Sequence, residues 1–394
     1  MRALFISCLF LSLAHAAELR SWTDIQDRKV EATLLRIADQ TVILKLKDGR
    51  EVPYPLAKLS ADDCKYVEEN RARLTVIEAA KASDDSGEAF NFDAPWPQIV
   101  KYSEDPEINI VEEDPEKKSF IYESTNYRYI CNVRLAKSVV KSFAVLFEAT
   151  HLYCRSLPLA INGGQRVNGK YQILLFEQVD DYVKAGGQPN YAGIFITNRS
   201  AVLVPLTSLG VMRVGSGYMQ DWGKSSSTIS HELTHQLSPE SYFKKGAKGW
   251  FSEGIADYVG QTPYRSGIFS VYGNQKEIID YVTGYGTKNK GGLALGKKIH
   301  MPALKTFMLQ DYASFQQQQH ISYGCGLLLT LYFLQMDGDG DGKRIKAFLK
   351  ALHEGMHGEK SLDLLLDGRS FEKLQEDFAK AWSRKGIEFT FAVE

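Results

Sequence analysis

The amino-acid sequence predicts an α+β protein in which a small β-rich domain precedes a larger domain that begins with strands and ends with helices. Segments 29–34, 41–47 and 51–54 alternate apolar and polar residues, and Asp48–Gly49 marks a hairpin turn between two of them. From residue 97, strand-like and amphipathic segments follow one another, and the pattern is mostly helical from Leu304 on. Strands first and helices later are typical of the α+β class.

The first 17 residues are interpreted as a signal peptide rather than as part of the fold. Arg2 provides a positive start, residues 4–14 are nearly all apolar, and Ala14-His15-Ala16 is an A-x-A cleavage signal. No later stretch approaches 18 apolar residues, so we expect no membrane span. The mature protein is expected to be exported and soluble, in a periplasmic or extracellular location.

Charge and cysteine content bear on two questions, whether the protein binds nucleic acid and whether disulfides hold its fold together. The 394 residues include 47 Lys or Arg and 48 Asp or Glu, with both signs interspersed, which gives no indication of a nucleic-acid partner. Four cysteines follow the signal peptide, Cys64, Cys131, Cys154 and Cys325, and their scatter does not suggest a disulfide framework. A Cys131–Cys154 bridge and buried free thiols both remain open, as does the oligomeric state.

Composition divides the mature chain into a small domain at 18–70, a helix end and linker at 71–96, and a large domain at 97–394. Ser60-Ala61-Asp62-Asp63 is a capped helix start, and residues 82–98 turn polar with two prolines around Trp96. The run at 20–23, the turn at 47–51 and the segment 55–60 resemble an SH3-like module found in a cytoskeletal adaptor and at the front of exported bacterial proteins. The resemblance implies a small β-barrel, which serves either as a spacer or in ligand binding.

The chemistry is concentrated in Ser230-His231-Glu232-Leu233-Thr234-His235, which contains H-E-x-x-H. Residues four apart share one face of a helix, so His231 and His235 can offer two imidazoles to one metal ion, with Glu232 beside them as general base. Ser225, Ser226 and Ser227 are candidate helix starts, and Pro239 limits the helix. Ile229, Leu233 and Leu237 form an apolar stripe on roughly the opposite side.

A second short helix is expected in Gly249-Trp250-Phe251-Ser252-Glu253-Gly254-Ile255-Ala256-Asp257-Tyr258, stopped by Gly260. Glu253 and Asp257 stand four apart on one face. A catalytic zinc takes three protein ligands and keeps an open position, so Glu253 is the candidate third ligand. A histidine ligand also needs its other ring nitrogen held, which suits Asp257.

Together the two motifs resemble the gluzincin metallopeptidases, which pair H-E-x-x-H with a downstream E-G-x-A-x-Y or E-x-x-x-D helix. The two motifs are separated by the 17 residues 236–252, which is close to the usual gluzincin spacing. The resemblance covers about 97–394 and implies a small mixed sheet, an active-site helix, a helical C-terminal lobe, one zinc per chain and a peptide or protein substrate. It also implies a tyrosine that steadies the oxyanion; Tyr323 is the leading candidate and Tyr258 the other. Pro205 predicts an edge strand at 201–206, which would either bind extended substrate or simply end there.

Two further motifs compete for a metal. His353-Glu354-Gly355-Met356-His357 repeats H-E-x-x-H, but Gly355 and Gly358 predict that the helix frays there. Asp337, Asp339 and Asp341 match the front of an EF-hand loop, but position 12 is Phe348 and not glutamate. We expect a polar turn between helices, with Ca²⁺ as the alternative.

The sequence therefore predicts an exported, zinc-dependent hydrolase, most simply a peptidase that uses His231, His235 and Glu253 as ligands and Glu232 as base. Two alternatives remain at this point: a non-catalytic binding or scaffold protein that retains its zinc site, and a zinc amidase that acts on non-peptide amides. Glu232 favours catalysis, because a degenerate site usually loses this base first.

Overall fold

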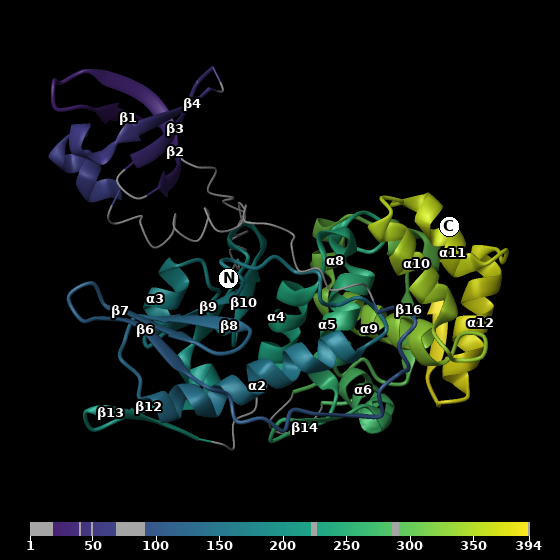
Figure 1. Ribbon diagram of the computed structural model, residues 1–394. Helices are drawn as coiled ribbons and strands as arrows, with labels where there is room; N and C mark the ends of the chain where they lie inside the picture. Colours follow the sequence, from purple (N-terminus) through teal and green to yellow (C-terminus); the bar gives the residue numbers. More distant parts are fainter. Residues whose placement is uncertain are drawn as a thin grey trace, which may run out of the picture. The chain divides into compact units, whose positions relative to one another are not determined.

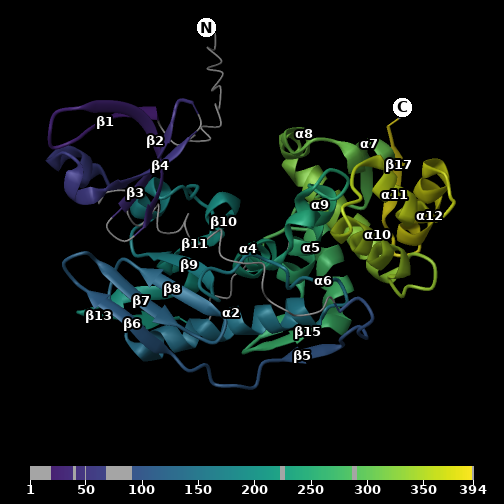
Figure 2. The same ribbon diagram turned by 45° about the horizontal axis from the view of Figure 1, so that its top comes forward.

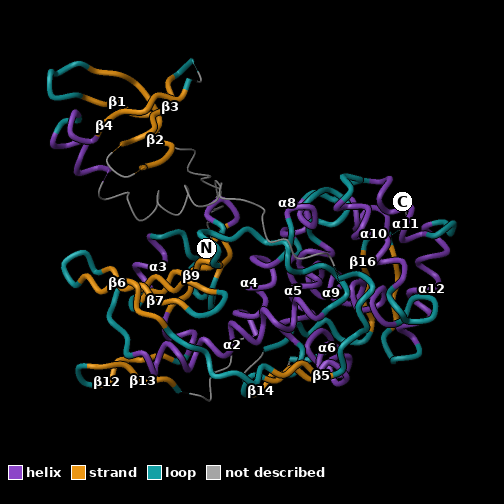
Figure 3. Tube along the Cα trace, viewed as in Figure 1, coloured by secondary structure: helices purple, strands orange, loops and turns teal. Residues whose placement is uncertain are grey.

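The chain divides into two units, Met1–Ala82 and Ser83–Glu394, and each is described by itself. The computed structural model describes residues 19–38, 41–48, 50–67, 91–221, 227–285 and 291–392 (Figure 1). Both helices and strands are present throughout the larger unit (Figure 3), so the predicted α+β class is confirmed.

The first unit is built on a four-stranded antiparallel sheet in the order β1-β2-β3-β4. Its strands are β1 (Leu19–Thr23), β2 (Lys29–Ala38), β3 (Thr41–Leu46) and β4 (Glu51–Pro55), followed by η1 (Leu56–Lys58) and helical residues 61–67. The Ser60 hydroxyl accepts from Asp63 N–H at 3.2 Å, so the predicted helix cap forms. The Asp63 carboxylate in turn accepts from Thr23 N–H at 2.6 Å, which ties the helix to β1.

The expected barrel is, in the described part of this unit, an open sheet. After η1 the chain returns to β1 through a single antiparallel bridge between Asp24 and Leu59. Ile25 N–H and Ser60 N–H donate to carbonyl oxygens on either side of that bridge. One bridge is not a strand pair, and closure of a barrel requires a continuous ladder.

In its described residues the larger unit contains four sheets, of which a six-stranded one in the order β10-β11-β9-β8-β7-β6 is the largest. Its strands are β6 (Asn109–Asp114), β7 (Ser119–Glu123), β8 (Tyr127–Cys131), β9 (Tyr171–Phe176), β10 (Ile194–Ile196) and β11 (Ala201–Pro205). The smaller sheets are β14-β15-β5, β12-β13 and β16-β17, formed by β5 (Ile99–Lys101), β12 (Val211–Val214), β13 (Gly217–Gln220), β14 (Tyr264–Arg265), β15 (Ile268–Ser270), β16 (Lys298–Met301) and β17 (Glu388–Phe391).

Strand order in the six-stranded sheet corrects an expectation about its edge. β11 lies between β10 and β9, pairing antiparallel with the first and parallel with the second, and all five of its residues are buried. Pro205 is tolerated because it is the last residue of the strand, from which η3 (Leu206–Leu209) begins. The predicted edge at 201–206 is therefore wrong, and the edge strand on this side is β10.

Most helices gather at the opposite end of the larger unit from β6–β9, whereas α2 packs on the sheet and α3 lies beside β9 (Figures 1 and 2). The helices of the described part of this unit are α2 (Lys137–Ser156), α3 (Val179–Lys184), α4 (Ser227–Leu237), α5 (Trp250–Gln261), α6 (Asn274–Thr283), α7 (Leu304–Leu309), α8 (Tyr312–Gln317), α9 (Gln319–Gln335), α10 (Lys343–His353), α11 (Glu359–Leu366) and α12 (Phe371–Ser383). Short 3₁₀ turns lie at η2 (Thr197–Arg199), η4 (Glu240–Phe243) and η5 (Val271–Gly273). The helical lobe expected after Leu304 is present, although β17 returns from it to pair with β16.

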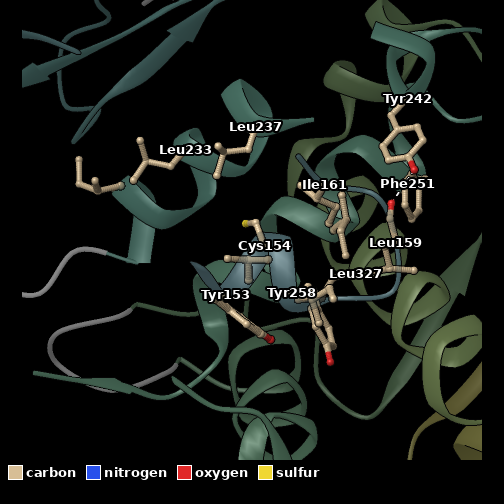
Figure 4. Close-up of a cluster of buried hydrophobic side chains, with 14 of the residues drawn as sticks. Tyr153, Cys154, Leu159, Ile161, Leu233, Leu237, Tyr242, Phe251, Tyr258 and Leu327 are labelled. Atoms are coloured by element: carbon tan, nitrogen blue, oxygen red, sulfur yellow. Dashed lines mark hydrogen bonds between the residues drawn. The ribbon is translucent and has the colours of Figure 1, made fainter. Parts of the chain in front are cut away.

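One continuous core joins the sheet to the helices, and α4 contributes its apolar stripe to it. Ile229, Leu233 and Leu237 are fully buried, as the spacing predicted. In Figure 4 Leu233 and Leu237 lie in the same cluster as Tyr153 and Cys154 of α2. Burial of this stripe fixes the rotation of α4 about its own axis, so the face that carries the histidines is turned the other way.

None of the helices in the described ranges is both long and apolar enough to cross a membrane. Cys64, Cys131, Cys154 and Cys325 are all free thiols, so the Cys131–Cys154 bridge is not formed and the alternative of unpaired thiols holds.

Candidate metal centre

Helix α4 supplies the two histidines. Ser227 is its first described residue, whereas the candidate starts Ser225 and Ser226 lie outside the described residues. The helix ends at Leu237, two residues before Pro239. His231 and His235 therefore stand one turn apart, and their rings meet edge to face with centroids 4.7 Å apart.

Helix α5 supplies the carboxylates, and its glycines explain how closely it approaches its neighbours. A Cβ on Gly254 would lie 2.2 Å from Thr330 Oγ1 and 2.6 Å from the Gly326 carbonyl oxygen of α9. A Cβ on Gly260 would lie 2.7 Å from the Ser227 carbonyl oxygen of α4. Gly260 does not stop the helix, which runs on to Gln261; it allows α4 and α5 to pack at close range instead.

Three ligand atoms converge between the two helices. His231 Nε2 and His235 Nε2 are 3.0 Å apart, and Glu253 Oε2 lies 3.4 Å from the first and 3.2 Å from the second. His235 and Glu253 are buried and His231 is half-buried. Two nitrogens and one carboxylate oxygen at these separations can hold a metal ion, and among the described residues this is the one such group of three.

Asp257 orients His231 through a hydrogen bond from the ring nitrogen that points away from the other two ligand atoms. His231 Nδ1–H donates to Asp257 Oδ1 at 2.8 Å, which leaves Nε2 directed at the other two ligand atoms. Burial disfavours a charged imidazole, but the adjacent Asp257 carboxylate outweighs it and raises the pKa of His231 well above its usual value. Burial likewise disfavours a charged Glu253, yet the neighbouring histidines hold the pKa of Glu253 well below its usual range.

Glu232 lies on α4, the helix that carries the histidines. Its Oε2 accepts from the backbone N–H of Phe195 in β10 at 2.7 Å. Burial raises the pKa of Glu232 even though both histidines and this N–H act in the opposite direction. The edge strand β10 thus holds one carboxylate oxygen of Glu232 in place.

A cavity of about 380 Å³ opens beside these groups. His231, Glu232 and Asp257 line it, and so does Tyr323 of α9, the leading tyrosine candidate. Around them the lining comes from several elements: Asn190, Tyr191, Ala192, Ser227, Thr228, Gln261, Tyr281, Leu293, Gln319 and His320. Tyr258, the other tyrosine candidate, is fully buried and its hydroxyl accepts from Gln335 Nε2 at 3.2 Å, so it packs between α5 and α9.

Sequence reasoning missed Tyr312, the first residue of α8. Its hydroxyl donates to Glu253 Oε1 at 2.8 Å, and it also interacts with the Tyr323 hydroxyl. Burial and the nearby Glu253 carboxylate raise the pKa of Tyr312, so it stays a neutral donor. Tyr312 is 59 residues from Glu253 and belongs to no motif, so no signal in the sequence could have singled it out.

The second H-E-x-x-H has a different role. Helix α10 ends at His353, and Gly355 follows with φ of 88°, so His353 and His357 do not share a helical face. His353 Nε2 lies 3.2 Å from the Tyr242 hydroxyl, and His357 Nδ1 lies 2.8 Å from the Gly355 carbonyl oxygen. The expected fraying at the glycine is confirmed, and His353 sits in the last helical turn, where a cation is favourable.

The EF-hand-like segment is a turn between α9 and α10, as expected. The buried Asp337 carboxylate accepts from Arg344 at 3.0 Å, from Arg369 at 2.9 and 3.1 Å and from the Tyr332 hydroxyl at 3.0 Å. Two guanidinium groups therefore occupy the oxygens that would begin a calcium loop with Asp339 and Asp341. This arrangement opposes a Ca²⁺ site at the turn.

A family model matches the front of the chain. Residues 12–74 match the family model of SLA1 homology domain 1, SHD1. The matched segment contains the turns and strands that resemble an SH3-like module. No curated protein matches the chain. The first unit is thus similar to SLA1 homology domain 1.

Proposed function

We propose that the chain is an exported zinc-dependent metallopeptidase whose larger unit is a catalytic domain of the gluzincin type. The observation that supports this most strongly is the triangle formed by His231 Nε2, His235 Nε2 and Glu253 Oε2, with sides of 3.0, 3.4 and 3.2 Å. Tetrahedral zinc with bonds of roughly 2.0–2.1 Å has ligands about 3.3–3.4 Å apart. The three atoms therefore match one face of a zinc tetrahedron.

The donor set also fits zinc chemically. Two imidazoles and one carboxylate are of the borderline softness that zinc prefers, and three protein ligands leave a fourth position open. Asp257 accepts a hydrogen bond from the ring nitrogen that His231 does not offer to the metal. When bound, zinc supplies the Lewis acidity that makes a water molecule a nucleophile near neutral pH and that polarises a peptide carbonyl.

Glu232 carries the proton in this mechanism. With Oε2 engaged by Phe195 N–H, Oε1 takes the proton of the attacking water and later gives it to the leaving amine. The raised pKa of Glu232 suits both halves of that transfer, because a less acidic carboxyl group takes up the proton more readily and holds it until the amine leaves. Tyr323 lines the cavity with a neutral hydroxyl and is the candidate donor to the developing oxyanion.

The edge strand β10 suggests how a substrate would lie. It borders α4, and its side away from β11 faces Glu232 through Phe195 N–H. An extended peptide pairing with this edge would bring a backbone carbonyl to the metal centre. The position of a sheet edge beside the metal centre thus favours a peptide over a compact non-peptide amide.

Metal analysis combined with a digest of a broad peptide library tests the proposal. Purified mature protein should carry about one zinc per chain, and its peptide cleavage should stop on chelation and return with added zinc. Bound zinc without cleavage of any peptide would favour the scaffold role, and protein that does not bind zinc would refute the metal centre itself.

A further inference from the structure

The two carboxylate oxygens of Glu253 have different partners, and Tyr312 is the partner of one of them. Oε1 accepts the Tyr312 hydroxyl at 2.8 Å, whereas Oε2 faces the two histidine nitrogens at 3.2 and 3.4 Å. A carboxylate can bind a metal through one oxygen or through both, and the second oxygen takes up a further coordination position. A hydrogen bond to Oε1 opposes binding through both.

We propose that Tyr312 is a positioning residue that keeps Glu253 a one-oxygen ligand and so preserves the open coordination position on which hydrolysis depends. This inference rests on the proposed zinc site and goes beyond it, because it assigns a task to a residue outside both motifs. The Tyr312 hydroxyl reaches Glu253 from α8, a different helix from the one that carries the histidines.

Contacts with neighbouring side chains hold the ring of Tyr312 in place and so fix the position of its hydroxyl. The ring stacks on Phe315 with centroids 6.1 Å apart and planes inclined by 8°, and Lys248 Nζ lies 5.1 Å from its centroid. Phe315 is buried against Gly249, where a Cβ would come within 3.0 Å of its ring.

Gly249 links this packing to the ligand. It precedes α5 with φ of 92°, a conformation that favours glycine, and its N–H donates to the Ser252 hydroxyl at 3.0 Å. The start of α5, which carries Glu253, and the start of α8, which carries Tyr312, are therefore packed together through Phe315. Hydrogen bonds of this kind to a ligating carboxylate tune the metal as well as orient the ligand.

The alternative is that Tyr312 merely satisfies a buried carboxylate oxygen and matters for folding alone. Tyr312→Phe removes only the hydroxyl and separates the two readings. Tyr258→Phe is the matched control. Tyr258 lies on α5, the helix that carries Glu253, but its hydroxyl is bonded to Gln335 and it does not line the cavity. Thermal unfolding of the metal-free proteins shows whether each variant has retained its fold.

The measurements are the d–d absorption spectrum of the Co²⁺-substituted proteins and the zinc dissociation constant from chelator competition. Co²⁺ absorbs more weakly as its coordination number rises, so Tyr312→Phe should lower the intensity relative to wild type. Zinc affinity should fall about tenfold in that variant, the usual effect of losing a hydrogen-bond partner of a ligand. Tyr258→Phe should change neither quantity.

An unchanged cobalt spectrum in Tyr312→Phe would overturn the inference, whatever the variant does to stability, and so would an equal spectral change in Tyr258→Phe. Failure of the proposed function is distinguishable, because in that case wild-type protein itself would not bind Co²⁺ or Zn²⁺ at this site.

Discussion

His231 Nδ1 and Asp257 Oδ1 lie 2.8 Å apart, one from each of the two helices that form the candidate metal centre. In the neutral ring the contact places the proton on Nδ1, so that Nε2 is the nitrogen that can bind a metal. Asp257 reaches this position because it stands one turn after Glu253 on a helix of which every residue is buried.

Removing the Asp257 carboxylate should therefore weaken zinc binding. Asp257→Ala is expected to raise the zinc dissociation constant by at least about tenfold, because the His231 ring loses its orientation and part of its basicity. Asp257→Asn is the matched control, since its amide oxygen can still accept from Nδ1–H and should preserve more of the affinity. Chelator competition measures both, and an unchanged constant in Asp257→Ala would defeat the assignment.

The two H-E-x-x-H motifs provide a second test with an internal control. His231→Ala removes one corner of the ligand triangle and should abolish stoichiometric zinc, as determined by metal analysis of the purified variant. His353→Ala alters the other motif, whose histidine contacts the Tyr242 hydroxyl, and should leave the zinc content near one per chain. Full zinc in His231→Ala would show that the metal binds elsewhere.

Glu232→Gln separates metal binding from chemistry. The glutamine keeps an oxygen that can accept from Phe195 N–H but cannot take up a proton. Zinc content should be unchanged, while kcat for any peptide substrate found in the library should drop by roughly 10²–10⁴, the usual share of general acid–base catalysis. Wild-type turnover in this variant would rule out Glu232 as the base.

Zinc binding should release a proton and should strengthen as pH rises. The pKa of His231 in the metal-free protein is raised by Asp257, so the ring is protonated near neutral pH and must lose that proton to bind zinc. The same shift stabilises the metal-free fold below the usual histidine pKa of 6.5, and that contribution is lost as pH rises through the elevated value. Calorimetric titrations in buffers of different ionisation enthalpy count the protons, and a count of zero at neutral pH would contradict the assignment.

The glycine of the downstream motif should be required for helix packing. Gly254→Ala places a methyl group against Thr330 and the Gly326 carbonyl oxygen, so α5 must move away from α9. Overpacking of about 1–3 kcal/mol should exceed the roughly 1 kcal/mol that alanine adds to helix propensity. Gly217→Ala in β13 is the control, because no atom lies within 4 Å of the added methyl group. Equal denaturation midpoints for the two variants would disprove the close contact.

The candidate ligands could be predicted from the sequence, because their geometry is largely local. Four-residue spacing places His231 above His235 on one face of any helix that contains them, and the stripe at Ile229, Leu233 and Leu237 determines which face turns inward. The same local reasoning identified the fraying at Gly355 that separates His353 from His357.

Local patterns were less successful where strands must find partners. The predicted edge strand at 201–206 lies inside the sheet, between β10 and β9. Alternation of polar and apolar residues reports which face of a strand is buried, but not which strand lies beside it. For the same reason the strands of the first unit were recognisable while the extent of barrel closure was not.

Only the tertiary structure decided the surroundings of the ligands. Phe195 reaches Glu232 from an edge strand 37 residues away, and Tyr312 reaches Glu253 across 59 residues. Neither partner shares a helical face or a strand register with the residue it contacts. Such contacts depend on how whole elements pack after the chain has closed several loops, so the spacing of residues along the sequence does not encode them.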